Sequence, residues 1–173
     1  MKKVIRRNVF ETNSSSTHSV TIRKGEISKP YLIVDSEDNK VHVRFGEYGW
    51  GYEKLKSQHE RLSYLCTMLM ETEAEKAFSI EDVIQTEGFK KINEVIANKC
   101  NCDGIYFDEK IKTNNYKNSK GETVYYLDID GYIDHQSCED YSSINEFLED
   151  WDTNIIDFIF NDNITVIIDN DNN

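Results

Sequence analysis

Two segments with helical periodicity lie next to each other in the middle of this 173-residue chain. In residues 54–72 the apolar side chains recur at the spacing of one face of an amphipathic helix. A second helix is expected from a capping box at residues 79–82 to about residue 96, interrupted at Gly88. The neighbouring segments therefore have to supply a surface against which these helices bury their apolar faces.

The flanking segments carry short or alternating apolar patterns that are typical of strands. Residues 31–34 and 41–45 are predicted to pair as a hairpin, and residues 110–121 to form a loop. A further helix is expected near residues 142–151, followed by an apolar turn at 155–160. The order predicts a single α+β domain over residues 1–173, with a mostly antiparallel sheet and about three to four helices packed on one face. Roughly four residues at the end are expected to fray.

A run of small polar residues near the N-terminus is the main candidate site. Residues 12–19 contain no apolar side chain, so the run is predicted to be a loop between two strands. Its hydroxyl, amide and backbone groups can cap a helix, bond the local backbone or hold an anion. The candidate ligand-binding residues are Arg7, Asn13, Ser14, Ser15, Ser16, Thr17 and Ser19, together with Ser137 from a later segment.

Two histidines beside serines are the candidates for catalysis. His18 lies among hydroxyls, which suits activation of a nucleophile or contact with a phosphate. The structural alternative is that the hydroxyls cap backbone groups and His18 donates one hydrogen bond. Asp134 and His135 are the other candidates, and Ser137 follows His135 at the spacing found in two-histidine phosphoesterases. His18 lacks a hydroxyl residue at that spacing, so the match is half complete.

The sequence contains weaker indications of metal ligands. Asp128 and Asp130 would lie on one face of a strand, where two like charges are costly without a cation. Cys100 and Cys102 do not have the spacing of a zinc ribbon, and the four cysteines are expected to be free thiols. His42 lies on the polar face of its strand and is interpreted as an ordinary surface residue. We therefore expect no resident metal and no cofactor.

The net charge of −12 is distributed unevenly. The first thirty residues contain seven Lys and Arg against two acidic residues, whereas residues 121–173 contain fourteen acidic residues and no Lys or Arg. This asymmetry indicates a basic partner protein and argues against direct binding of nucleic acid. The alternative is a solvated acidic surface that only aids solubility. The candidate partner-binding residues are Glu139, Asp140, Glu146, Glu149, Asp150, Asp152 and Asp157.

The chain shows no apolar run long enough to span a membrane and no signal-peptide pattern. We therefore expect a cytoplasmic protein that does not associate with membranes. The sequence leaves its oligomeric state open.

The motif Val-Phe-Glu-Thr-Asn-Ser-Ser-Ser-Thr-His-Ser at residues 9–19 resembles a family of uncharacterised proteins from phages and prophages of Gram-positive bacteria. Segments 45–50, 63–65 and 132–137 support this resemblance, which spans nearly the whole chain. The family has no assigned activity, so the resemblance implies a phage context and no residue roles. In a phage context, small acidic proteins often resemble inhibitors of host defence.

Three functions are compatible with these patterns. The leading expectation is a phage-encoded acidic binding protein that engages and inhibits a basic host protein in the host cytosol, such as a defence protein or one that handles nucleic acids. The second is an enzyme that binds or hydrolyses a phosphoester or nucleotide in a pocket between the serine-rich run and residues 134–137. The third is a structural or assembly protein of the virion.

Overall fold

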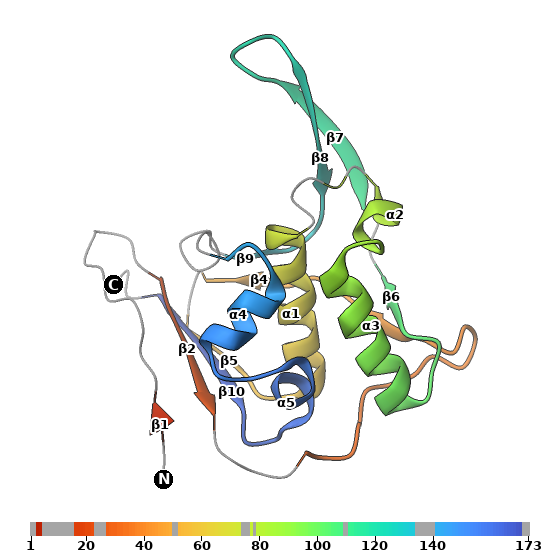
Figure 1. Ribbon diagram of the computed structural model, residues 1–173, viewed down its shortest axis with the longest axis vertical. Helices are drawn as coiled ribbons and strands as arrows, with labels where there is room; N and C mark the ends of the chain where they lie inside the picture. The colour runs from red at the N-terminus through yellow and green to blue at the C-terminus, as the bar shows by residue number, and fades with distance from the viewer. Residues whose placement is uncertain are drawn as a thin grey trace.

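The computed structural model describes residues 3–4, 16–22, 27–49, 52–73, 77, 79–108, 111–133 and 141–170, of which 3–4, 16–22 and 169–170 are described by their backbone alone. Within these ranges the predicted α+β class is confirmed (Figure 1). The elements are β1 (Lys3–Val4), β2 (Ser16–Ile22), β3 (Val41–Val43), β4 (Glu47–Tyr48), β5 (Glu53–Leu55), α1 (Gln58–Thr72), α2 (Ile80–Val83), α3 (Glu87–Cys100), β6 (Ile105–Phe107), β7 (Lys112–Lys117), β8 (Thr123–Asp128), β9 (Tyr132–Ile133), α4 (Ile144–Asp150), α5 (Ile155–Phe160) and β10 (Thr165–Asn170). No helix among the described residues is long and apolar enough to cross a membrane.

The largest sheet has four antiparallel strands in the order β1-β2-β10-β5. β10 is a central strand, with Thr165 opposite Thr21 in β2 and Val166 opposite Leu55 in β5. Val166 and Ile168 alternate with more exposed residues and are fully buried, as expected for a strand that packs one face on a core. Figure 1 shows α1 at the centre of the molecule, between this sheet and α3.

The predicted hairpin of residues 31–34 and 41–45 is wrong. Val34 forms only an isolated bridge to Val41, and β3 instead pairs in parallel with β6. Leu32 is buried and Ile33 exposes 85% of its surface, so the segment has the alternation of a strand, but no described strand forms a ladder with it. β4 and β9 form a second parallel pair, so among the described residues the antiparallel strands are those of the four-stranded sheet and the β7–β8 hairpin.

Two segments predicted to be loops contain strands. Residues 16–19 of the polar run belong to β2, because β10 supplies a backbone partner for each of them. Residues 112–117 form β7, which pairs with β8 along its whole length. Both predictions failed for the same reason: a backbone ladder stabilises a strand without requiring apolar side chains. The β7–β8 hairpin projects from the body of the molecule (Figure 1).

Capping determines where the central helices begin. α1 starts at Gln58, four residues later than expected, because the side chains of Ser57 and Glu60 form a reciprocal capping box. The helix predicted for residues 79–96 is two helices, since the Thr86 side chain accepts a hydrogen bond from the Phe89 amide and starts α3 after α2 has ended. The described chain therefore has five helices rather than three to four.

A buried arginine connects α1 to the C-terminal third. Arg61 has no exposed surface, and burial lowers the pKa of its guanidinium. Its Nη2 donates to the carbonyl oxygen of Ile159 at 2.7 Å, and its Nη1 donates to that of Ile164 at 2.9 Å and to that of Lys56. The partners described for this guanidinium are thus backbone carbonyl groups from three segments.

The carboxylate of Glu73 joins three helices at the C-terminal end of α1. Oε2 accepts a hydrogen bond from the Gly88 amide in α3 at 2.7 Å, and Oε1 accepts one from the Ile144 amide in α4 at 3.1 Å. Both amides lie in the first turn of their helix, where backbone donors have no partner inside the helix. A side chain on Gly88 would collide with this carboxylate.

Candidate functional site

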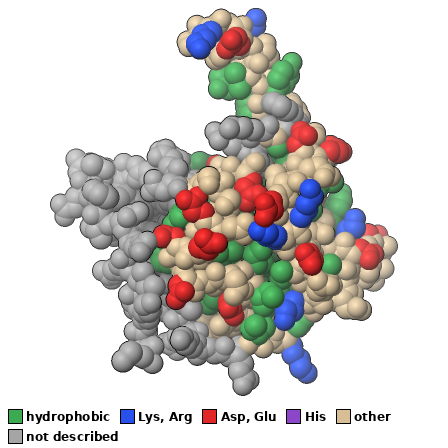
Figure 2. All heavy atoms as spheres, viewed as in Figure 1, with side chains coloured by type: hydrophobic (Ala, Val, Ile, Leu, Met, Phe, Trp, Pro, Cys, Tyr) green, Lys and Arg blue, Asp and Glu red, His purple; other side chains and the backbone are tan. Residues whose placement is uncertain are grey.

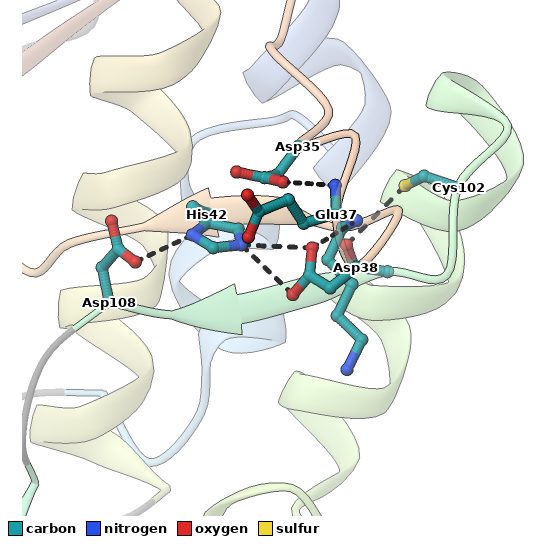
Figure 3. A network of polar contacts seen from close by, with 8 residues as sticks. Asp35, Glu37, Asp38, His42, Cys102 and Asp108 are labelled. Carbon is teal, nitrogen blue, oxygen red and sulfur yellow. Dashed lines mark hydrogen bonds and ion pairs between the residues drawn. The ribbon is translucent and has the colours of Figure 1, made fainter.

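A cluster of three carboxylates around His42 stands out in the described part of the chain (Figure 3). His42 is the middle residue of β3, between Val41 and Val43, which are fully buried. The alternation of a strand therefore points its imidazole away from the core. Asp108 follows β6, the parallel neighbour of β3, and its amide donates to the carbonyl oxygen of Val43 at 2.9 Å.

The turn at residues 35–40 supplies the other two carboxylates. The Asp35 amide donates to the Lys40 carbonyl oxygen at 2.8 Å, which closes the turn. The side chains of Asp35 and Asp38 accept hydrogen bonds from the amides of Glu37 and Lys40, at 2.7 Å and 3.1 Å. Asn39 has a φ of 56°, a left-handed conformation that asparagine tolerates better than most residues. Local backbone bonds thus fix the positions of both carboxylates.

Both imidazole nitrogens of His42 contact carboxylates. Nδ1 lies 2.8 Å from Oδ1 of Asp108, and Nε2 lies 3.2 Å from each oxygen of Asp38. The side chains of His42, Asp38 and Asp108 expose 30%, 36% and 31% of their surface. Ligand atoms of Asp35, Asp38 and His42 all lie within 4.8 Å of one another. Figure 3 shows the imidazole between Asp108 on one side and Asp38 on the other.

The carboxylates change the titration of His42. Partial burial by itself would lower the pKa of the imidazole, but the hydrogen bonds and charges of Asp38 and Asp108 outweigh it. The pKa of His42 is therefore raised above its usual value. The imidazolium form donates to both carboxylates, whereas the neutral form can donate to only one.

Three further side chains border the cluster. The Tyr106 ring lies 4.9 Å from the His42 ring between centroids, and Lys40 Nζ lies 6.0 Å from the centre of the Tyr106 ring. Arg44 Nε lies 3.7 Å from Asp108 Oδ2, although 75% of the Arg44 side chain is exposed. These cations are more distant than the contacts between His42 and its carboxylates. The cluster is therefore an acidic site that can hold a proton or another cation.

The site predicted around the serine-rich run cannot be built from the described residues. Arg7, Asn13, Ser14, Ser15, Asp134, His135 and Ser137 lie outside them. His18 is placed by its backbone in β2, opposite Ile168 of β10, with Ser16, Thr17 and Ser19 in the same strand. The convergence of His18 and His135 stays a prediction. What the structure corrects is the conformation, because the second half of the run is a strand and not a loop.

Asp128 and Asp130, predicted as a pair of metal ligands, do not lie on one continuous strand as expected. β8 ends at Asp128, so the strand alternation that would align the two carboxylates does not continue to Asp130. Asp128 Oδ2 accepts a hydrogen bond from the Asn114 side chain at 2.8 Å across the hairpin. Among the described residues the cluster with metal-ligand spacing is the one around His42.

The acidic residues predicted to bind a partner fall into two groups. Glu146 accepts hydrogen bonds from the backbone and hydroxyl of Ser142, which lower the pKa of its carboxyl group. Asp157 bonds Asn154 in the first turn of α5, and Asp150 accepts from the Tyr141 hydroxyl at 3.2 Å. Within the described ranges, Glu149 and Asp152 are exposed and form no ion pair. Glu139 and Asp140 lie outside those ranges.

Sequence reasoning missed His42 because the carboxylate that contacts its Nδ1 is invisible to a local reading. Asp108 lies 66 residues away along the chain and reaches His42 only through the parallel pairing of β3 and β6. The one local signal is the acidic turn that precedes the strand, with Asp38 four residues before His42. Comparison of the chain with protein-family models, curated proteins and solved structures found no match.

Proposed function

We propose that this chain is a phage-encoded, non-enzymatic binding protein whose acidic C-terminal third engages and inhibits a basic host protein. The observation that carries the proposal is the state of Glu149 and Asp152, which are exposed and form no ion pair with any described residue. Exposed carboxylates that form no ion pair within the described ranges are available to a partner, and a basic surface complements them.

The surroundings of these two residues support the proposal. No Lys or Arg occurs in residues 121–173, so the chain following the hairpin offers no cation to neutralise them. Figure 2 shows acidic side chains spread over the face where α4 and α5 lie in Figure 1, whereas many Lys and Arg side chains lie toward α3. Such a field accelerates encounter with a basic protein and repels the phosphates of nucleic acid.

The β7–β8 hairpin offers the apolar contacts that charge alone does not provide. Tyr116, Tyr125 and Tyr126 expose 54%, 50% and 41% of their surface. Tyr116 and Tyr126 lie on one face of the hairpin, with ring centroids 6.1 Å apart. Exposed aromatic residues are enriched where proteins bind one another, and a two-stranded hairpin has few internal contacts of its own.

The test compares a charge-neutralised variant with a matched control. The wild-type chain, Glu149→Gln/Asp152→Asn and Glu81→Gln/Glu94→Gln are immobilised and exposed to an extract of a Gram-positive host. The control removes the same charge from exposed positions on α2 and α3. Asn suits position 152, whose φ of 52° is left-handed, so the substitution does not disturb the end of α4.

The outcome is judged on one retained basic protein after its purification. We expect its dissociation constant to rise about fivefold for the Glu149/Asp152 variant, since two rim charges contribute modest amounts each. The control variant should bind like the wild type, and binding should weaken between about 50 mM and 500 mM salt. Equal losses in both variants, or binding that salt does not affect, would refute the role of this face.

The hairpin is tested separately on the same partner. Tyr116→Ala/Tyr126→Ala should weaken binding without changing the circular dichroism of the chain, because both rings are exposed. Tyr52→Ala removes another exposed ring, outside the hairpin, and serves as the control. If the two variants lose equal affinity, the hairpin has no specific role.

A further inference from the structure

The hydrogen bond between His42 and Asp108 determines which ring nitrogen is free to act as a ligand. A carboxylate only accepts hydrogen bonds, so the contact of 2.8 Å places the proton of a neutral imidazole on Nδ1. Nε2 then presents its lone pair to the two oxygens of Asp38, each 3.2 Å away. Two acceptors that face each other repel unless a cation lies between them.

A proton can be that cation at low pH, when His42 is an imidazolium. Once His42 is neutral, a metal ion can take the same role. Two donor atoms bound at about 2.1 Å to one transition-metal ion lie roughly 3 Å apart. The distances of 3.2 Å between Nε2 and the Asp38 oxygens match this separation.

Asp35 completes the set of ligands. Its carboxylate lies within 4.8 Å of the other ligand atoms, and it comes from the same closed turn as Asp38. Two carboxylates balance the charge of a divalent ion bound by a neutral imidazole. Because all three side chains are partly exposed, water can fill the remaining coordination positions.

We propose that Asp35, Asp38 and Nε2 of His42 bind a divalent transition-metal ion, Zn²⁺ or Mn²⁺, and that Asp108 positions the imidazole. A metal-bound histidine usually donates its second ring nitrogen to a carboxylate, which fixes the tautomer and orientation of the ring. Mixed nitrogen and oxygen ligands favour such ions over Mg²⁺ and Ca²⁺, which prefer oxygen alone. The site is independent of the acidic face assigned to partner binding.

The deciding experiment is a calorimetric titration of the full chain with MnCl₂ near pH 7.5. Mn²⁺ is used because it has little affinity for thiolates, so the cysteines do not compete. We expect one ion per chain, and at least tenfold weaker binding in His42→Ala and in Asp38→Asn. His59→Ala and Asp103→Asn, which alter exposed residues outside the cluster, should bind like the wild type.

Asp108 is tested as a positioning residue. Asp108→Asn should weaken binding by about 10- to 100-fold, because the ligands are retained but the imidazole is held less firmly. Nitrogen NMR of the histidine rings with ZnCl₂ should show the ion on Nε2 of His42 and Nδ1 still protonated. A merely structural role for Asp108 would leave both the affinity and this spectrum unchanged.

Several outcomes would overturn the proposal. Absence of binding by the folded wild type up to millimolar Mn²⁺ would show that a proton alone bridges His42 and Asp38. Binding that survives His42→Ala, or ligation through His59, would place the ion elsewhere. Asp38→Asn keeps an oxygen acceptor for the Lys40 amide, so this variant is expected to fold and the test does not depend on His42→Ala alone.

Discussion

Substitution of Arg61 by Met tests whether a buried guanidinium holds the C-terminal third on α1. The change keeps an unbranched side chain but removes every donor to three backbone carbonyl groups. The carbonyl groups of Ile159 and Ile164 are in buried contacts, and an unsatisfied buried acceptor costs about 1 to 3 kcal/mol. The third, from Lys56, is partly exposed and can turn to water.

The expected loss in free energy of unfolding is about 3 kcal/mol. This value takes roughly 2 kcal/mol for each of the two buried carbonyl groups and subtracts about 1 kcal/mol, because a charge no longer has to be desolvated. For a domain of this size such a loss lowers Tm by about 6 to 12 °C. Arg61→Lys keeps the charge but not the planar fork, so its stability should fall between those of Arg61→Met and the wild type.

Urea denaturation followed by circular dichroism measures both variants. Arg44→Met is the matched control, since Arg44 is 75% exposed and its ion pair with Asp108 spans 3.7 Å. It should change the free energy of unfolding by about 0.5 kcal/mol or less. A loss below about 1 kcal/mol in Arg61→Met would refute the argument, because it would mean that the carbonyl groups find other donors.

Three further predictions concern stability. Glu73→Ala should cost about 2 kcal/mol in urea denaturation, because the Gly88 and Ile144 amides lose their acceptor, whereas Glu94→Ala should cost under about 0.5 kcal/mol. Gly104→Ala should lower the free energy of unfolding, measured by thermal unfolding, by about 1 kcal/mol more than Gly121→Ala does. Both glycines have a positive φ, but only at Gly104 would the new methyl group collide with a side chain. That side chain is Asn93, which accepts a hydrogen bond from the Ile105 amide. In EDTA, the stability that the imidazolium of His42 gains from Asp38 and Asp108, measured against His42→Ala, should be fully present below pH about 6.5 and be lost as pH rises through the raised pKa of His42. A stability difference that does not change with pH would contradict this pairing of His42 with the two carboxylates.

The sequence predicts best those parts of the fold that depend on local apolar periodicity. The face of α1 that contains Leu62, Leu65 and Leu69 is fully buried, as its helical spacing indicates. β8 and the helix after Ser143 also follow from local patterns and capping. In α1 and α4 the physical cause is burial of a periodic face, which consecutive residues encode. In β8, where no residue is buried, the local signal is instead the strand propensity of its β-branched and aromatic residues.

The features that could not be predicted depend on a distant partner. β7 is a polar segment that becomes a strand because β8 supplies its hydrogen bonds. β3 pairs with β6, although α1, α2 and α3 lie between them in the sequence, and no local pattern distinguishes that pairing from a hairpin. The contact between His42 and Asp108 also depends on this pairing, because the two side chains meet only when β3 and β6 are side by side. Tertiary pairing, not side-chain propensity, determines these features.

The position of β10 between β2 and β5 has a consequence for biosynthesis. Both neighbours of this strand are made long before it, and neither can complete its hydrogen bonds until residues 165–170 have left the ribosome. Until then the nascent chain carries strands whose edges are open to pairing with other chains. Such non-local closure slows folding, since a long loop must be ordered before the contacts form. The four-stranded sheet is therefore expected to close only after residues 165–170 have emerged, and before that point the open strands make the nascent chain a candidate for chaperone binding.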